Sequence, residues 1–205
     1  MLRIGLTGGI ASGKSTVAAL LRDRDYPVLD TDVLAHELLE PGQDAYDEVV
    51  NEFGDGILTE GRRVDRRKLG AVVFADAGKR ERLNQIMHPR IQQIAAQWFQ
   101  ALDRPGGPDL AFEDAALILE AGAKGSFDRV VVCWCRPEQQ IARLRARGLL
   151  LEDAQQRIRS QMSMDEKRRL ADDVIDCSVS MEDTEKQVEE FIARWKQVAA
   201  KAKNR

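Results

Sequence analysis

Short apolar runs that predict buried strands alternate along the chain with longer stretches of helical period. The run at residues 130–135, Val-Val-Val-Cys-Trp-Cys, is the clearest strand because it is β-branched, aromatic and apolar on both faces. Four further strands are predicted at residues 2–6, 26–30, 110–112 and 174–175. Because this alternation is typical of a parallel sheet covered on both faces, we predict an α/β fold with a doubly wound, five-stranded parallel sheet.

A long helical segment separates the second predicted strand from the third. It spans about eighty residues, far more than one crossover helix needs. Inside it, Glu40-Pro-Gly42 predicts a helix end, Phe53-Gly-Asp-Gly56 a turn, and Pro89 the start of another helix. The Pro/Gly-rich linker Asp103–Pro108 follows, and residues 184–205 predict a C-terminal helix. We therefore expect an insertion with its own role.

Composition and charge limit the classes of protein to which this chain can belong. The 205 residues carry a formal net charge of -3, so we expect no nucleic-acid partner bound through overall positive charge. No apolar run approaches the length of a membrane span and the start does not resemble a signal peptide, so we expect no membrane contact and a cytoplasmic location. Three cysteines in an ordinary composition predict reduced thiols.

The stretch TGGIASGKST, Thr7 to Thr16, has the spacing of a loop that binds phosphates. Gly8 and Gly13 allow a close backbone approach, so that consecutive N–H groups can point at a β-phosphate. Lys14 is expected to reach the β- and γ-phosphates, and Ser15 to ligate Mg²⁺. A chance glycine-rich turn is the alternative, but the motif follows a strand and opens a helix. The motif therefore predicts that a nucleoside triphosphate binds here, but it does not identify the acceptor of the phosphoryl group.

Two carboxylates follow the second predicted strand, in Asp30-Thr-Asp32. In a doubly wound sheet they lie near the carboxyl edge, where ligands bind. Asp32 could take the proton of an acceptor hydroxyl. It could equally cap the helix that begins at Val33, and the two roles are not exclusive.

Basic residues gather after the fourth strand. Arg143 and Arg147 share one helical face, Gly148 follows, and a second helix is predicted to carry Arg157, Arg159 and residues 167–169. This arrangement could form a lid that closes over phosphates. The alternative is a solvated helix face on which acidic residues interleave with the basic ones. We favour this alternative for any single arginine, and the functional role for the pair Arg143 and Arg147.

Other candidates have simpler interpretations. Cys133 and Cys135 lie two residues apart on a strand, but neither of the two histidines is near them, so we interpret both as core residues rather than zinc ligands. His88-Pro89, taken alone, reads as a helix start.

Taken together, these and further segments resemble the dephospho-CoA kinase family nearly from end to end. The segments that carry the resemblance are LTGGIASGKST (6–16), LDTD (29–32), LEPG (39–42), VFA (73–75), LNQIMHPRI (83–91), ALILE (116–120), RPEQQIARL (136–144), RIRSQM (157–162) and ADDVID (171–176). The resemblance implies a P-loop, nucleoside-monophosphate-kinase-like three-layer fold within one domain, residues 1–205. Its core would be 1–32, 108–136 and 170–205, with a helical CoA-binding insertion at about 33–107 and a lid at about 137–169.

The activity implied is transfer of the γ-phosphoryl of ATP, with Mg²⁺, to the ribose 3′-hydroxyl of dephospho-CoA, the last step of coenzyme A synthesis. Asp32 would be the catalytic base, with Lys14 and Arg143 acting in catalysis; Thr7, Asp32 and His88 would meet the acceptor. The nucleotide would be bound by Gly8, Ala11, Ser12, Gly13, Lys14, Ser15, Thr16 and Arg147, with Ser15 also on the metal. We expect a monomer or a weak homo-oligomer.

Two positions depart from the family pattern. Ala116 stands where proline is frequent, so the loop after the third strand is expected to be less rigid. Cys177 stands where asparagine is common, and a thiol cannot replace an amide toward an adenine edge, so Cys177 is not included among the nucleotide ligands. The alternative function is another nucleoside-monophosphate or small-molecule P-loop kinase. A GTP-binding switch is disfavoured because Asn-Lys-x-Asp is absent from the sequence.

Overall fold

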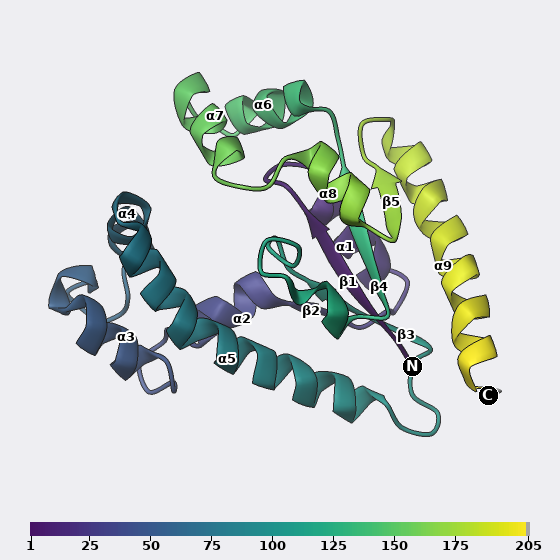
Figure 1. The fold of residues 1–205 in the computed structure, drawn as a ribbon, viewed down its shortest axis with the longest axis horizontal. Coiled ribbons are helices and arrows are strands. Elements are labelled where there is room, and N and C mark those ends of the chain that lie inside the picture. The colour runs from purple at the N-terminus through teal and green to yellow at the C-terminus, as the bar shows by residue number, and fades with distance from the viewer. Residues whose placement is uncertain (204–205) are drawn as a thin grey trace. The chain divides into compact units, whose positions relative to one another are not determined.

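The computed structural model describes residues 1–203, and its elements alternate between strands and helices (Figure 1). The strands are β1 (Leu2–Gly8), β2 (Val28–Asp30), β3 (Leu110–Asp114), β4 (Arg129–Trp134) and β5 (Asp173–Asp176). The α-helices are α1 (Lys14–Arg22), α2 (Thr31–Glu37), α3 (Tyr46–Phe53), α4 (Arg66–Ala75), α5 (Ala77–Leu102), α6 (Pro137–Ala146), α7 (Leu151–Arg159), α8 (Met164–Leu170) and α9 (Met181–Lys203). Short 3₁₀ helices lie at Asp55–Ile57 and Ala123–Ser126.

The five strands form one parallel sheet in the order β2-β3-β1-β4-β5, which confirms the predicted fold class. Strand β1 is central. The chain leaves β1 toward β2 and leaves β4 toward β5, in opposite directions. The carboxyl ends of β1 and β4 therefore meet where the strand order reverses, which is the usual ligand site of such a sheet.

Alternating side chains of the strands are buried on opposite faces of the sheet. Leu6 of β1 and Val131 of β4 pack in one cluster with Val17 of α1 and Trp195 of α9. The neighbouring residues Val130 and Val132 pack in another cluster with Ile118 and with Met164 of α8. Because strand side chains alternate with a period of two, both faces of the sheet are covered, which explains why β4 is apolar throughout.

The chain divides into two compact units. We call Met1–Asp30 together with Phe99–Arg205 the core unit, and Thr31–Trp98 the helical unit. The helical unit has its own buried cluster, which includes Leu34 of α2, Val49 of α3, Leu69 of α4 and Ile86 of α5. It therefore buries apolar surface of its own, as expected of a segment much longer than a crossover.

Two helix boundaries differ from the predicted ones. Pro89 does not begin a helix but lies inside α5, which starts instead after Asp76, whose side chain accepts hydrogen bonds from the N–H groups of Gly78 and Lys79. The single basic helix predicted after Gly148 is two helices, α7 and α8. They separate at Ser163, whose hydroxyl caps α8 by accepting from the N–H of Glu166 at 3.2 Å.

Within residues 1–203, no helix combines the length and the apolar character that a membrane span requires.

Candidate active site

The predicted phosphate loop lies between the end of β1 and the start of α1, and its glycines Gly8 and Gly13 have no room for a side chain. A Cβ at Gly8 would lie 2.4 Å from Ser12 Oγ and 2.8 Å from the carbonyl oxygen of Cys133. Gly13 has φ 113°, and a Cβ there would lie 2.7 Å from Cys177 Cβ. The backbone conformation and the close packing therefore both require glycine at position 13.

A cavity of about 240 Å³ opens beside this loop in the core unit. Its wall contains five residues that the sequence predicts to bind the nucleotide, Ala11, Gly13, Ser15, Thr16 and Arg147, together with Arg143, which was predicted to act in catalysis. The structure thus brings together residues from the loop and from α6, which are more than a hundred positions apart in the chain.

Five further residues of the cavity wall were not predicted. They are Cys177, Val179, Ser180, Met181 and Thr184, from the loop after β5 and the start of α9. No motif marks them. The signal that could have found them is their place after a strand that ends at the same edge of the sheet as β1.

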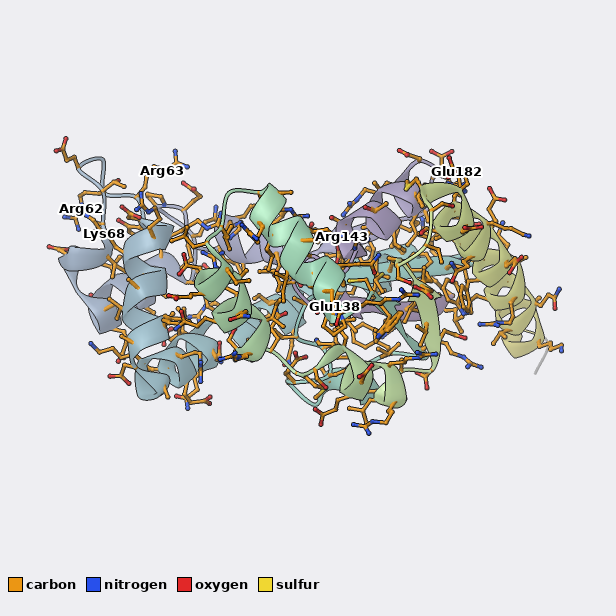
Figure 2. All side chains as sticks on the ribbon, turned by 90° about the horizontal axis from the view of Figure 1, so that it is seen from above. Arg62, Arg63, Lys68, Glu138, Arg143 and Glu182 are labelled. Atoms are coloured by element: carbon orange, nitrogen blue, oxygen red, sulfur yellow. The ribbon has the colours of Figure 1, made fainter. Side chains whose placement is uncertain are left out.

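Arg143 fastens α6 to the loop. Its guanidinium donates to the carbonyl oxygen of Ala11 at 3.1 Å and to that of Cys177 at 2.7 Å. Figure 2 marks Arg143 on the same helix as Glu138, and marks Glu182 near the start of α9. Arg147 ends α6 and is exposed, so its charge can reach into the cavity that it lines.

Lys14 forms an ion pair with Asp114, the last residue of β3. Asp114 is 2% exposed, so its charge is compensated within the protein. No sequence motif singles out Asp114. It could have been found as a carboxylate at the carboxyl end of a strand adjacent to the loop, but its approach to Lys14 depends on β3 lying beside β1, which only the sheet order determines.

Thr7, Gly8 and Ser12 are the buried residues of the loop whose ligand roles were predicted. The Thr7 hydroxyl donates to the carbonyl oxygen of Ala116 at 3.0 Å, in the loop after β3. Lys167 donates to the same oxygen at 2.8 Å and forms an ion pair with Glu120. In this structure Thr7 therefore orders the loop after β3, and its contact with the acceptor stays a prediction.

Lys167 differs from the solvated or lid-forming basic residue that the sequence suggested. It is fully buried, and burial lowers its pKa while the hydrogen bond to Glu120 opposes that shift. A buried ammonium needs a paired carboxylate, so Lys167 and Glu120 together hold α8 against the loop after β3.

Asp32 and His88 both lie in the helical unit. Asp32 is the exposed second residue of α2, inside its first turn, so it is not the N-cap that the alternative interpretation required. A carboxylate in a first turn still interacts favourably with the helix dipole. His88 is half-buried in α5. The catalytic and acceptor-binding roles of these two residues stay predictions.

The three cysteines are buried. Cys133 and Cys177 are hydrogen-bonded to each other; this bond, together with Arg143, lowers the pKa of Cys177, whereas burial raises the pKa of Cys133. Within residues 1–203, no three His, Cys, Asp or Glu side chains are grouped closely enough to bind a metal ion. Burial makes all three cysteines part of the packed interior, and Cys177 also forms part of the cavity wall.

Comparison with known proteins identifies the family. The model of the family described as dephospho-CoA kinase matches residues 2–183. The chain belongs to the dephospho-CoA kinase family. A dephospho-CoA kinase from Bacillus licheniformis is 42% identical over 198 residues, covering 96% of this chain and 98% of the relative.

Solved structures agree with this membership. A crystal structure of a Thermus thermophilus protein superposes with a TM-score of 0.81 at 35% identity, covering 94% of this chain and 97% of that one. The dephospho-CoA kinase from Campylobacter jejuni superposes with a TM-score of 0.70 at 26% identity, covering 95% of this chain and 97% of that one. The P-loop kinase fold expected of a dephospho-CoA kinase is therefore confirmed.

Proposed function

We propose that this chain transfers the γ-phosphoryl group of ATP to the ribose 3′-hydroxyl of dephospho-CoA, giving coenzyme A and ADP as the last step of coenzyme A synthesis. The observation that carries the proposal is a dephospho-CoA kinase family match over residues 2–183 in a chain whose phosphate loop borders a cavity of about 240 Å³. The phosphate loop supports ATP as the phosphoryl donor, and membership of the family supports dephospho-CoA as the acceptor.

The donor phosphates would bind at the start of α1. There the backbone N–H groups of the first turn and the helix dipole favour an anion. The ion pair with Asp114 already holds the Lys14 ammonium beside the loop. From there the ammonium would also interact with the β- and γ-phosphates. Asp114 thus acts as a positioning residue for Lys14 in this proposal.

Mg²⁺ fits the residues present around Ser15. A magnesium ion in such a site takes few protein ligands and is completed by phosphate oxygens and water, which agrees with the lack of a three-carboxylate group among the described residues. The Ser15 hydroxyl, in the cavity wall, would be the protein ligand. When bound, the ion neutralises negative charge on the transferred phosphoryl group.

Arg143 and Arg147 would stabilise the charge that develops on the phosphates. Arg143 is fixed by two backbone carbonyl oxygens, so its guanidinium is already oriented, whereas the exposed Arg147 has freedom to follow the nucleotide. Preorganised positive charge of this kind costs no rearrangement when the transition state forms.

Asp32 would take the proton of the 3′-hydroxyl as that oxygen attacks the γ-phosphorus, and ADP would leave with the bond to the β-phosphate oxygen broken. Thr7 and His88 are proposed near the acceptor. The helical unit would bind the rest of dephospho-CoA, and the segment 137–169 would close over the phosphates.

The test is an acceptor screen together with replacement of the base. ADP release from ATP and Mg²⁺ should require dephospho-CoA, and Asp32→Asn should lower kcat by roughly 10²- to 10⁴-fold while ATP affinity stays unchanged. Asp47→Asn is the matched control, because Asp47 is also an exposed carboxylate in the first turn of a helix in the helical unit. It should keep kcat within about twofold.

Two results would contradict the proposal. Full turnover by Asp32→Asn would contradict the assignment of Asp32 as the catalytic base. If a nucleoside monophosphate or another small alcohol stimulated ADP release and dephospho-CoA did not, the proposed acceptor would be wrong.

A further inference from the structure

The backbone of the phosphate loop makes a tight turn over Gly9–Ser12 that is unusual for its sequence. The N–H of Ser12 donates to the carbonyl oxygen of Gly9 at 3.1 Å, and Ala11 has φ 58°. Ile10 is not among the described residues with positive φ, so the turn has the pattern of type II. That pattern favours glycine at the third position, whereas this chain has alanine there, at a cost in conformational free energy.

Two glutamines from the segment 137–169 hold the central residue of this turn. Gln140 Nε2, on α6, donates to the carbonyl oxygen of Ile10 at 2.7 Å. The N–H of Ile10 donates to Gln161 Oε1, between α7 and α8, also at 2.7 Å. Both polar groups of one loop residue are therefore bonded to side chains that come from the predicted lid.

The bond from Gln140 determines which way the Ile10–Ala11 peptide faces. Types I and II of a β-turn differ by a flip of this central peptide, and type I would give Ala11 the negative φ that an alanine prefers. The flip would turn the Ile10 carbonyl away from Gln140 and break the bond. In a planar trans peptide the N–H of Ala11 points opposite to that carbonyl, so the same bond orients the N–H of a residue that lines the cavity.

The surroundings of Gln140 indicate that this bond is not made for stability alone. Gln140 is 2% exposed, and its Oε1 has no hydrogen-bond partner within residues 1–203. A buried unpaired oxygen lowers stability. A Cβ at Gly9 would lie 2.7 Å from Gln140 Nε2 and 2.7 Å from Met164 Sδ, so the loop is packed directly against these side chains.

We infer that Gln140 and Gln161 are positioning residues for the phosphoryl donor: Gln140 holds the Ile10–Ala11 peptide in the flipped orientation, Gln161 fixes the preceding Gly9–Ile10 peptide, and together they connect the phosphate loop to the segment 137–169. This inference rests on the proposed use of the loop for ATP. Both glutamines act through the backbone of Ile10, to which they are hydrogen-bonded.

The decisive variant is Gln140→Met, which keeps the length of the side chain but removes the donor and the unpaired oxygen. Calorimetric titration with Mg²⁺ and the non-hydrolysable analogue AMP-PNP should show a Kd about fivefold higher, the order expected for losing one hydrogen bond. The KM for ATP should rise in parallel and the KM for dephospho-CoA should not change. The Tm should be equal to that of the parent or higher, whereas a purely structural role would lower it.

A second substitution tests the orientation itself. Ala11→Gly in the Gln140→Met background should return the AMP-PNP Kd to within about twofold of the Ala11→Gly single variant, because glycine adopts positive φ without cost. Gln161→Met should weaken binding in the same direction as Gln140→Met. Gln156→Met is the matched control: this exposed glutamine lies on α7 in the same segment 137–169, and its variant should bind AMP-PNP as the parent does.

Unchanged AMP-PNP affinity in both Gln140→Met and Gln161→Met would overturn the inference. Weakened affinity that Ala11→Gly does not restore would overturn the assignment to peptide orientation. Because the titration needs no acceptor, a parent chain that fails to phosphorylate dephospho-CoA would contradict the proposed function and leave this comparison intact.

Discussion

Glu113 and Asp114 are neighbours on β3, but their carboxyl groups point to opposite faces of the sheet and differ in charge compensation. Asp114 is paired with Lys14. Burial raises the pKa of Glu113 from 4.5 to about 7. Ionisation of Glu113 as the pH rises through about 7 therefore opposes folding.

Replacing Glu113 by glutamine should stabilise the protein in a pH-dependent way. The folded pKa lies above the unfolded one, so between pH 4.5 and about 7 the folded state binds more protons and stability falls as pH rises. Glu113→Gln should therefore raise the free energy of unfolding by about 1 to 3 kcal/mol at pH 8 and by much less at pH 4.5. Urea unfolding at both pH values measures this.

The control for this prediction is Glu138→Gln, at an exposed carboxylate on α6 (Figure 2). It should change stability by no more than about 0.5 kcal/mol at either pH. A gain for Glu113→Gln that is the same at pH 4.5 and pH 8 would show that Glu113 is not the titrating group.

Among the elements, α5 shows how a local signal can be overruled. Pro89 is a common first residue of helices, yet it lies in the interior of a helix of 26 residues. Its ring removes the hydrogen bond that an N–H at this position would donate to the carbonyl of residue 85. The buried side chains of Ile86 and Met87, one turn before, pack in the core of the helical unit and hold the helix together across the proline.

Pro89→Ala should restore the missing hydrogen bond. We expect a rise of about 1 to 3 kcal/mol in the free energy of unfolding, measured by urea denaturation. Pro105→Ala is the matched control, because Pro105 lies in the linker before β3 and its replacement should leave stability unchanged or slightly lower. Equal effects of the two replacements would mean that α5 is not a continuous helix at Pro89.

At the scale of the whole molecule, the chain combines two units with separate hydrophobic clusters. All residues that line the cavity belong to the core unit. The acceptor is assigned by the proposal to the helical unit. Each substrate should therefore slow the hydrogen exchange of backbone amides in a different unit.

Hydrogen exchange followed by mass spectrometry tests this separation. Mg²⁺ with AMP-PNP should slow exchange in residues 8–16 and 177–184 and leave the amides of α3 and α4 unchanged, because a ligand protects the groups it orders. Dephospho-CoA alone should instead slow exchange within Thr31–Trp98. Equal protection of α3 and α4 by AMP-PNP would contradict the assignment of the nucleotide to the core unit.

The sequence by itself determined the features that depend on neighbouring residues. The phosphate loop could be predicted because Gly8, Gly13 and Lys14 act within one strand–turn–helix unit. The five strands could be predicted because β-branched, apolar runs have a local signature, and the alternation of strands and helices implies a parallel sheet. The resemblance to the family supplied the acceptor and Asp32, which no spacing in the chain distinguishes from a helix cap.

Only the tertiary structure decided which distant residues meet the loop. Asp114 faces Lys14, Cys177 lies against Gly13, and Gln140 and Gln161 hold Ile10. Each contact joins segments a hundred or more positions apart and depends on the strand order β2-β3-β1-β4-β5 or on the fold of the segment 137–169. Hydrophobic patterns determine which face of an element is buried but not which elements become neighbours, so these partners follow from the packing of the whole core unit.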